Sequence, residues 1–106
     1  MMMKSNIDSY YAVIFTSQQL ENILGYEEMA KQMEKLAKSQ KGFLGIESAR
    51  DDIGITVSYW DSLEAIKAWK NNTDHLIAQK YGKSKWYKWY RVRICKVEKE
   101  YDFKSS

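Results

Sequence analysis

The sequence contains one cysteine, Cys95, and one histidine, His75, among its 106 residues. A single cysteine excludes a disulfide within the chain, and we expect a reducing, cytoplasmic environment. One thiol and one imidazole are also too few for a transition-metal site, which needs about three or four nitrogen or sulfur ligands. We therefore expect no metal, and we assign no cofactor.

Long hydrophobic runs are absent, because no segment approaches the roughly 18 apolar residues that span a membrane. The first residues, MMMKSNIDS, include a lysine but no apolar signal core, so we expect no secretory signal and no membrane partner. The sequence shows no internal repeat, low-complexity segment or linker. We expect one domain, residues 1–106, with flexible ends at 1–8 and 104–106.

Strong charge of one sign is also absent, since the net charge is +3 and basic and acidic residues alternate along most of the chain. The C-terminal third is more basic, and its lysines and arginines lie among several aromatic residues. Such a mixture can bind single-stranded nucleic acid, but it also fits a long amphipathic strand with its basic side in water. No RNA-binding signature accompanies it, so we favour the strand and expect no nucleic-acid partner.

Hydrophobic periodicity predicts six elements in the order βαββαβ. Strands are expected at 10–16, 43–50 and 55–60, with a long last strand inside 86–103. The first helix is expected from Tyr26 to about Gln40, with Gly42 as a left-handed stop after it. Between the middle strands, residues 51–54 predict a turn, with Gly54 available for positive φ.

The second helix is expected to begin at Ser62 and to end near residue 71 or 72, with Asp61 or Ser62 as its cap. Residues 71–74 are predicted to interrupt the helix, and a further short helix is expected from His75 to about Tyr81. The element order predicts a ferredoxin-like α+β fold, with an antiparallel sheet and both helices on one face.

The helix-free face of this sheet is predicted to carry large side chains. Small monomers rarely expose a contiguous apolar patch above a few hundred Å². A second copy of the chain, related by two-fold symmetry, is the simplest cover, and we predict a homodimer. The candidates for this face are Phe15, Ile46, Tyr59, Trp89, Val97 and Tyr101.

One stretch after the third strand resembles a known family. The string YWDSLEA at 59–65 is followed by Trp69 and His75, and the chain resembles the antibiotic biosynthesis monooxygenase (ABM) domain family over about residues 10–103. The resemblance implies a dimeric α/β barrel. The family also includes cofactor-independent oxygenases, so the resemblance implies such an activity. In these oxygenases a phenolic substrate is deprotonated or polarised in an aromatic pocket and itself reduces O₂. The further matching positions are Gln79, Gly82, Trp86, Tyr87, Tyr90, Arg93, Val97, Glu98 and Tyr101.

The family's site residues carry over only in part. Trp69 matches the helix tryptophan that quinone-forming and haem-degrading members share. The haem degraders' histidine falls at Gln79 in an ungapped comparison, and their first-strand asparagine falls at 13–15, where this chain has none. In the quinone-forming members a tyrosine stands near His75 and an asparagine near Ala65.

Three residues are the candidate catalytic groups. An imidazole can take a proton near neutral pH, so His75 is the candidate base. Trp69 can stack on a flat ligand, and Arg91 can stabilise developing negative charge. Structural roles are the alternative for each: a packed histidine, a core tryptophan and an interface salt bridge.

The candidate substrate-binding residues are aromatic pocket walls, with core packing as the alternative for each: Trp60, Tyr59, Phe15 and Trp86. The first functional hypothesis is an ABM-type monooxygenase acting on an aromatic, enolisable small molecule. The second is a dimeric ligand-binding or stress-associated domain without turnover. A haem-handling protein is the third.

Overall fold

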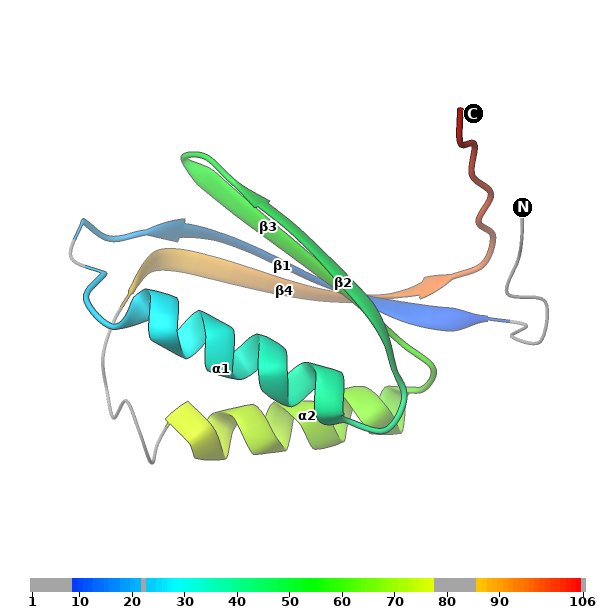
Figure 1. The fold of residues 1–106 in the computed structure, drawn as a ribbon, viewed down its shortest axis with the longest axis horizontal. Coiled ribbons are helices and arrows are strands. Elements are labelled where there is room, and N and C mark those ends of the chain that lie inside the picture. The colour runs from blue at the N-terminus through cyan, green and yellow to red at the C-terminus, as the bar shows by residue number, and fades with distance from the viewer. Residues whose placement is uncertain (1–8, 22, 78–85, 106) are drawn as a thin grey trace.

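A computed structural model describes residues 9–21, 23–77 and 86–105. The strands form one antiparallel sheet in the order β2-β3-β1-β4. Both helices lie against the same face of it (Figure 1). This confirms the predicted ferredoxin-like βαββαβ fold. The elements are β1 (Tyr10–Gln19), α1 (Tyr26–Ser39), β2 (Phe43–Arg50), β3 (Ile53–Trp60), α2 (Leu63–Leu76) and β4 (Tyr87–Val97).

The strand register assigns each side chain to a face of the sheet, because paired residues on neighbouring strands point the same way. Val13 of β1 pairs with Ser58 of β3 and with Ile94 of β4. Val13 also packs with Ala37 of α1 and Ile66 of α2. The row through Val13 therefore defines the helix side of the sheet. The opposite, helix-free face includes Tyr10, Ala12, Ile14, Val57, Tyr59, Trp89, Arg91, Cys95 and Val97.

The buried core lies where β3 runs into α2. Trp60 is fully buried there, and its ring centroid is 5.4 Å from that of Phe43 and 5.0 Å from that of Trp69. The indole Nε1 of Trp60 donates to Ser58 Oγ at 2.9 Å. Because the indole buries a large apolar area and satisfies its one donor, Trp60 anchors the helices on this half of the sheet.

The start of α2 follows the prediction, but the rest of the helix does not. Ser62 caps it by accepting from the Ala65 backbone N–H at 3.1 Å. The predicted break at 71–74 is wrong, since α2 continues to Leu76. Thr73 is buried and its hydroxyl donates back to the Lys70 carbonyl at 2.9 Å, while Asp74 forms an ion pair with Lys70 at 3.1 Å. These side chains bond along the helix instead of capping a new one.

Three turn and end predictions have different outcomes. Gly42 takes the left-handed conformation expected of it, with φ of 92°. Gly54 does not, because β3 begins at Ile53 and carries Gly54 as an ordinary strand residue. β1 is longer than predicted and ends at Gln19, since its polar last residues also pair with β3 and β4. The short helix predicted from His75 to about Tyr81 does not begin at His75, which lies in the last turn of α2. The rest of that prediction, from residue 78 on, and the predicted flexible end at 1–8 lie outside the described residues.

No helix in the described parts of the chain is long and apolar enough to cross a membrane.

Candidate functional site

The helix side of the sheet is uncovered along β4. Tyr90, Val92 and Ile94 face this side because they pair with Ser17, Phe15 and Val13 of β1. Their exposed fractions are 62%, 48% and 52%. Phe15 lies beside them and stacks on Tyr90, with ring centroids 5.4 Å apart and planes at 25°. We call these four residues the apolar strip. An apolar surface of this kind is where a ligand is expected to bind.

Trp69 of α2 lies on the core that borders the Ile94 end of the apolar strip. Its ring packs against the core cluster that contains Val13, and Val13 is the cross-strand neighbour of Ile94. Among the described residues, the Trp69 Nε1 is the one buried side-chain nitrogen or oxygen without a hydrogen-bond partner. Buried donors are nearly always paired, and leaving one unpaired costs about 1–3 kcal/mol. The indole N–H is therefore an unused donor.

Three aromatic residues close the opposite end of the strip. The ring of Tyr87 meets Phe15 edge-on at 5.4 Å and Tyr26 of α1 at 5.8 Å. Burial, followed by the hydrogen bond between the Tyr87 and Tyr26 hydroxyls at 3.4 Å, raises the pKa of Tyr87 well above its usual range. Tyr87 is therefore a neutral phenol at physiological pH. Trp86 is buried, and its Nε1 donates to the Leu24 carbonyl at 2.9 Å, which fastens the segment before α1.

The predicted catalytic residues do not converge in one protomer. His75 is exposed in the last turn of α2. It follows Trp69 by six residues, so the two side chains leave the helix about 120° apart. Arg91 lies on the helix-free face, where its guanidinium is 5.7 Å from the Trp89 ring. Of the three, only Trp69 packs against the core cluster that borders the apolar strip.

The predicted wall residues also divide between the two faces. Phe15 belongs to the apolar strip, whereas Trp60 is fully buried in the core beside it. Tyr59 lies on the helix-free face, where its hydroxyl donates to Glu47 at 2.9 Å. Burial, and then this hydrogen bond, raise the pKa of Tyr59. The strip residues Val92 and Ile94 were not predicted as site residues, although their alternation along the last strand is visible in the sequence.

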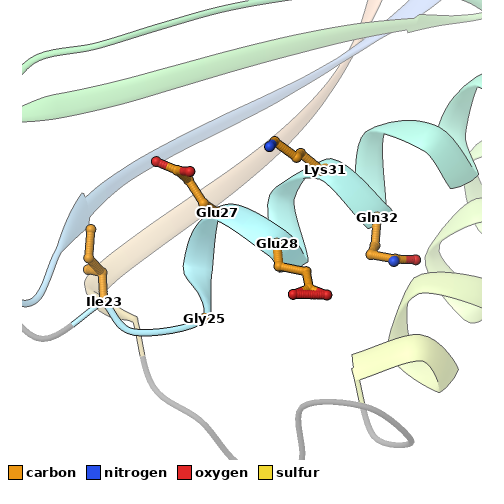
Figure 2. Close-up of a pocket in the computed structure, with 6 residues that line it drawn as sticks. All are labelled: Ile23, Gly25, Glu27, Glu28, Lys31 and Gln32. Atoms are coloured by element: carbon orange, nitrogen blue, oxygen red, sulfur yellow. The ribbon is translucent and has the colours of Figure 1, made fainter.

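A hollow at the start of α1 offers a weaker candidate. Figure 2 shows that its lining comes from α1 and from the segment before it, with charged side chains at its rim. Glu27 and Glu28 are exposed in the first turn, where carboxylates suit the positive end of a helix. The described residues hold no group of three or more acidic, His or Cys side chains suited to a metal ion. None of the predicted site residues lines this hollow, whose lining is Ile23, Gly25, Glu27, Glu28, Lys31 and Gln32.

Comparisons with known proteins agree with this fold. The sequence profile of the family described as antibiotic biosynthesis monooxygenase matches residues 12–81. The chain is 50% identical over 99 residues to "Uncharacterized protein YqjZ" of Bacillus subtilis (strain 168), covering 92% of this chain and 87% of that protein. The profile match and this relative show that the chain belongs to the antibiotic biosynthesis monooxygenase family.

Solved structures with low sequence identity share the fold. A mutant of MhuD with two manganese protoporphyrin IX molecules bound per active site has a TM-score of 0.70 and 16% identity, covering 88% of this chain and 99% of that chain. A mutant of SnoaB, a cofactor-independent oxygenase from Streptomyces nogalater, has a TM-score of 0.69 and 9% identity, covering 88% of this chain and 96% of that chain. At these identities the likeness extends to the fold alone.

Proposed function

We propose that the protein is a cofactor-independent monooxygenase that acts on an aromatic, enolisable small molecule bound between Trp69 and the apolar strip. The observation that carries the proposal is the buried, unpaired Trp69 Nε1 at the end of an exposed aromatic surface. A planar ligand covers the strip, and its oxygen accepts from the indole N–H. Membership of the family supports this choice, and SnoaB is one structural neighbour described as such an oxygenase.

In this chemistry the protein mainly binds the substrate and polarises it. The hydrogen bond from Trp69 Nε1 favours the enolate form of the substrate, because a donor stabilises developing negative charge. The enolate supplies the electrons that reduce O₂. One oxygen atom becomes a carbonyl on the ring carbon, which loses two hydrogens, and the other oxygen leaves with them as water. The apolar strip keeps bulk water from this carbon.

Oxygen uptake with dihydroxyanthrone substrates tests the proposal. Trp69→Phe keeps an aromatic ring and removes the donor, so we expect uptake to fall roughly a hundredfold, the usual effect of losing one such donor. The matched control is Trp89→Phe, which makes the same change on the helix-free face. Equal uptake by wild type and Trp69→Phe would contradict the assigned role.

The roles of His75 and Arg91 stay predictions. Their positions, on an exposed turn and on the helix-free face, give less support than that of Trp69. The uptake assay with His75→Ala and Arg91→Gln separates a catalytic role from a structural role for each residue. A catalytic base would cost its variant most of the activity, whereas unchanged rates would leave both residues with structural roles.

A ligand-binding domain without turnover is the second candidate. It is favoured by one observation: His75, the candidate base, is exposed in the last turn of α2 and leaves the helix about 120° away from Trp69, so the two side chains do not converge on one ligand. Saturable binding of the same anthrones with no oxygen uptake would support this candidate over the enzyme. For the third candidate, haem handling, a haem titration without a Soret shift would be decisive against it.

We also propose a homodimer that covers the helix-free face. That face carries apolar side chains along β1, β3 and β4, and the chain after β4 rises from the same side (Figure 1). Tyr101 and Phe103 of this segment are 87% and 89% exposed, which is unusual for aromatic side chains. A partner copy that packs against the face and this segment would form the dimeric barrel expected of the fold.

Light scattering in solution tests the dimer. We expect a molecular mass of about 25 kDa, twice the 12.5 kDa of one chain. Val57→Glu introduces a charge at the centre of the helix-free face and should give monomers, because an unpaired carboxylate is costly to bury in an interface. The matched control is Val92→Glu on the helix side. A stable 12.5 kDa wild-type species at micromolar concentration would refute the dimer.

A further inference from the structure

One arginine crosses the sheet toward the apolar strip. Arg50 of β2 pairs with Gly54 of β3, Gly54 pairs with Ser17 of β1, and Ser17 pairs with Tyr90 of β4. These four residues form a row across the helix side. The guanidinium of Arg50 reaches past β3 and donates to Ser17 Oγ at 2.5 Å. Its charge therefore lies one strand away from Tyr90, and strands are spaced by about 4.8 Å.

Gly54 and Ser17 hold this guanidinium in place, and we call these two residues the cradle. A Cβ atom on Gly54 would lie only 2.2 Å from Arg50 Cζ and 2.3 Å from one terminal nitrogen. The absence of a side chain at position 54 is therefore what lets Arg50 lie flat across β3. Ser17, the residue that receives its hydrogen bond, is fully buried. A fixed side chain loses less conformational entropy when it binds a ligand than a free one does.

Arg50 has no acidic partner within the described parts of the chain. The ion pairs found there are Glu34–Lys38 and Lys70–Asp74. The nearby carboxylate of Asp52 instead accepts from Gln18 at 2.9 Å. The positive charge of Arg50 also acts on Tyr87 at the end of the apolar strip, where it lowers a pKa that burial raises. A positioned guanidinium close enough to act on Tyr87, with no carboxylate within ion-pair distance among the described residues, is suited to an anion.

We propose that Arg50, held by Ser17 over Gly54, is the anion-binding end of the apolar strip. The ligand class is then a planar aromatic molecule that carries an acidic group at one end, such as a carboxylate, a sulfonate or an ionised phenol. The rings lie on the strip and the acidic group accepts from the guanidinium, which presents planar paired donors. This inference rests on the proposed function because it uses the same strip, and it adds the charge of the ligand.

A pair of fluorescent probes separates charge from shape. Anilinonaphthalene sulfonate carries an acidic group, and phenyl-naphthylamine has the same aromatic skeleton without it. We expect Arg50→Gln to weaken binding of the sulfonate by about tenfold to a hundredfold, as for other hydrogen bonds to charged groups. Binding of the neutral probe should stay within about twofold. The matched control is Lys35→Gln, which removes one positive charge from an exposed position on α1.

Two further variants test the cradle. Gly54→Ala should displace the guanidinium and Ser17→Ala should release it, so both should weaken the sulfonate selectively. Arg50→Lys keeps the charge but not the planar donors, and we expect it to recover only part of the affinity. Far-ultraviolet circular dichroism and the unfolding midpoint check that each variant is folded. Full sulfonate affinity in Gly54→Ala and Ser17→Ala would overturn the role of the cradle.

A strip variant distinguishes failure of this inference from failure of the proposed function. Val92→Asn should weaken both probes because it places a polar group on the strip. If Val92→Asn weakens both probes and Arg50→Gln changes neither, the strip binds ligands and the anion-binding role of Arg50 is refuted. If neither variant changes either probe, the strip itself is not the ligand site, and the location given in the proposed function fails as well.

Discussion

The helix side of the sheet has a closed half, around Trp60 and Val13, and an open half, along Phe15 and β4, and the two differ in how they are covered. In the closed half, Trp60 is fully buried, because Phe43, Trp69 and both helices surround it. In the open half, the apolar residues of β4 are half-exposed although they lie on the same side of the same sheet. The difference shows that an alternating strand can build a core or a binding surface, depending on where the helices lie.

The same contrast applies to two indoles in contact. Trp60 and Trp69 have ring centroids 5.0 Å apart, yet only Trp60 has a partner for its N–H, the Ser58 hydroxyl. Trp60 therefore completes the closed half. Trp69 stands at the border with the open half and retains an unused donor. A structural residue and a candidate ligand-binding residue can thus differ by one hydrogen bond.

The largest expected difference between the halves is in stability. Trp60→Ala should lower the free energy of unfolding by about 3–5 kcal/mol, because it empties a fully buried site. Val92→Ala should change it by less than about 0.5 kcal/mol, since the side chain is half-exposed. Urea denaturation measures both. A comparable loss in Val92→Ala would mean that the strip is covered in solution.

A single substitution made at two neighbouring sites gives the next largest effect. Trp60→Phe should cost about 1–3 kcal/mol, because the buried Ser58 hydroxyl loses its donor. Trp69→Phe should be nearly neutral, since removal of an unpaired buried N–H offsets the loss of ring area. Urea unfolding of the two variants, side by side, measures the difference. Equal losses would show that the Trp69 donor has a partner in solution.

Much of the fold could be predicted from the sequence because its signals are local. The period of apolar residues, the Ser62 cap and the left-handed Gly42 each act within a few residues, and all three agree with the structure. The break predicted at 71–74 failed because helix interior hydrogen bonds and an i,i+4 ion pair outweighed the capping tendency of Thr73 and Asp74.

The candidate site was harder to predict because it depends on contacts distant in sequence. Arg50 reaches Ser17 across 33 residues, and Gly54 matters only because it lies between them in the sheet. Sequence alternation placed Arg91 opposite Tyr90, but it could not show which side the helices leave uncovered. Trp69 was found through family resemblance, since its unpaired N–H is visible only in the structure.

A smaller effect is expected where α2 is attached to the closed half. Ser62→Ala removes the cap of α2 and should cost about 1 kcal/mol. Ser62→Asp keeps an acceptor for the Ala65 N–H and should retain most of the stability. The unfolding midpoint measures both variants, and probe binding to the apolar strip should not change, because the cap lies at the closed half. A loss of probe binding with no loss of stability would contradict the separation of the two halves.

The smallest expected effect is on the helix-free face. It concerns the contact between Tyr10 and Glu100, which should be independent of both halves of the helix side. The Tyr10 hydroxyl donates to Glu100, and this hydrogen bond, with some desolvation, raises the pKa of Tyr10 from 10.0 to about 12. Because the protonated phenol is favoured in the folded chain, its contribution is complete below pH 10 and is lost as the pH rises through 12. Glu100→Gln should therefore bring the tyrosinate absorbance change of Tyr10 to lower pH. It should also make the unfolding midpoint slightly less sensitive to alkali, while leaving probe binding on the helix side unchanged. An unchanged alkaline titration in Glu100→Gln would show that the segment after β4 does not hold Tyr10 in solution.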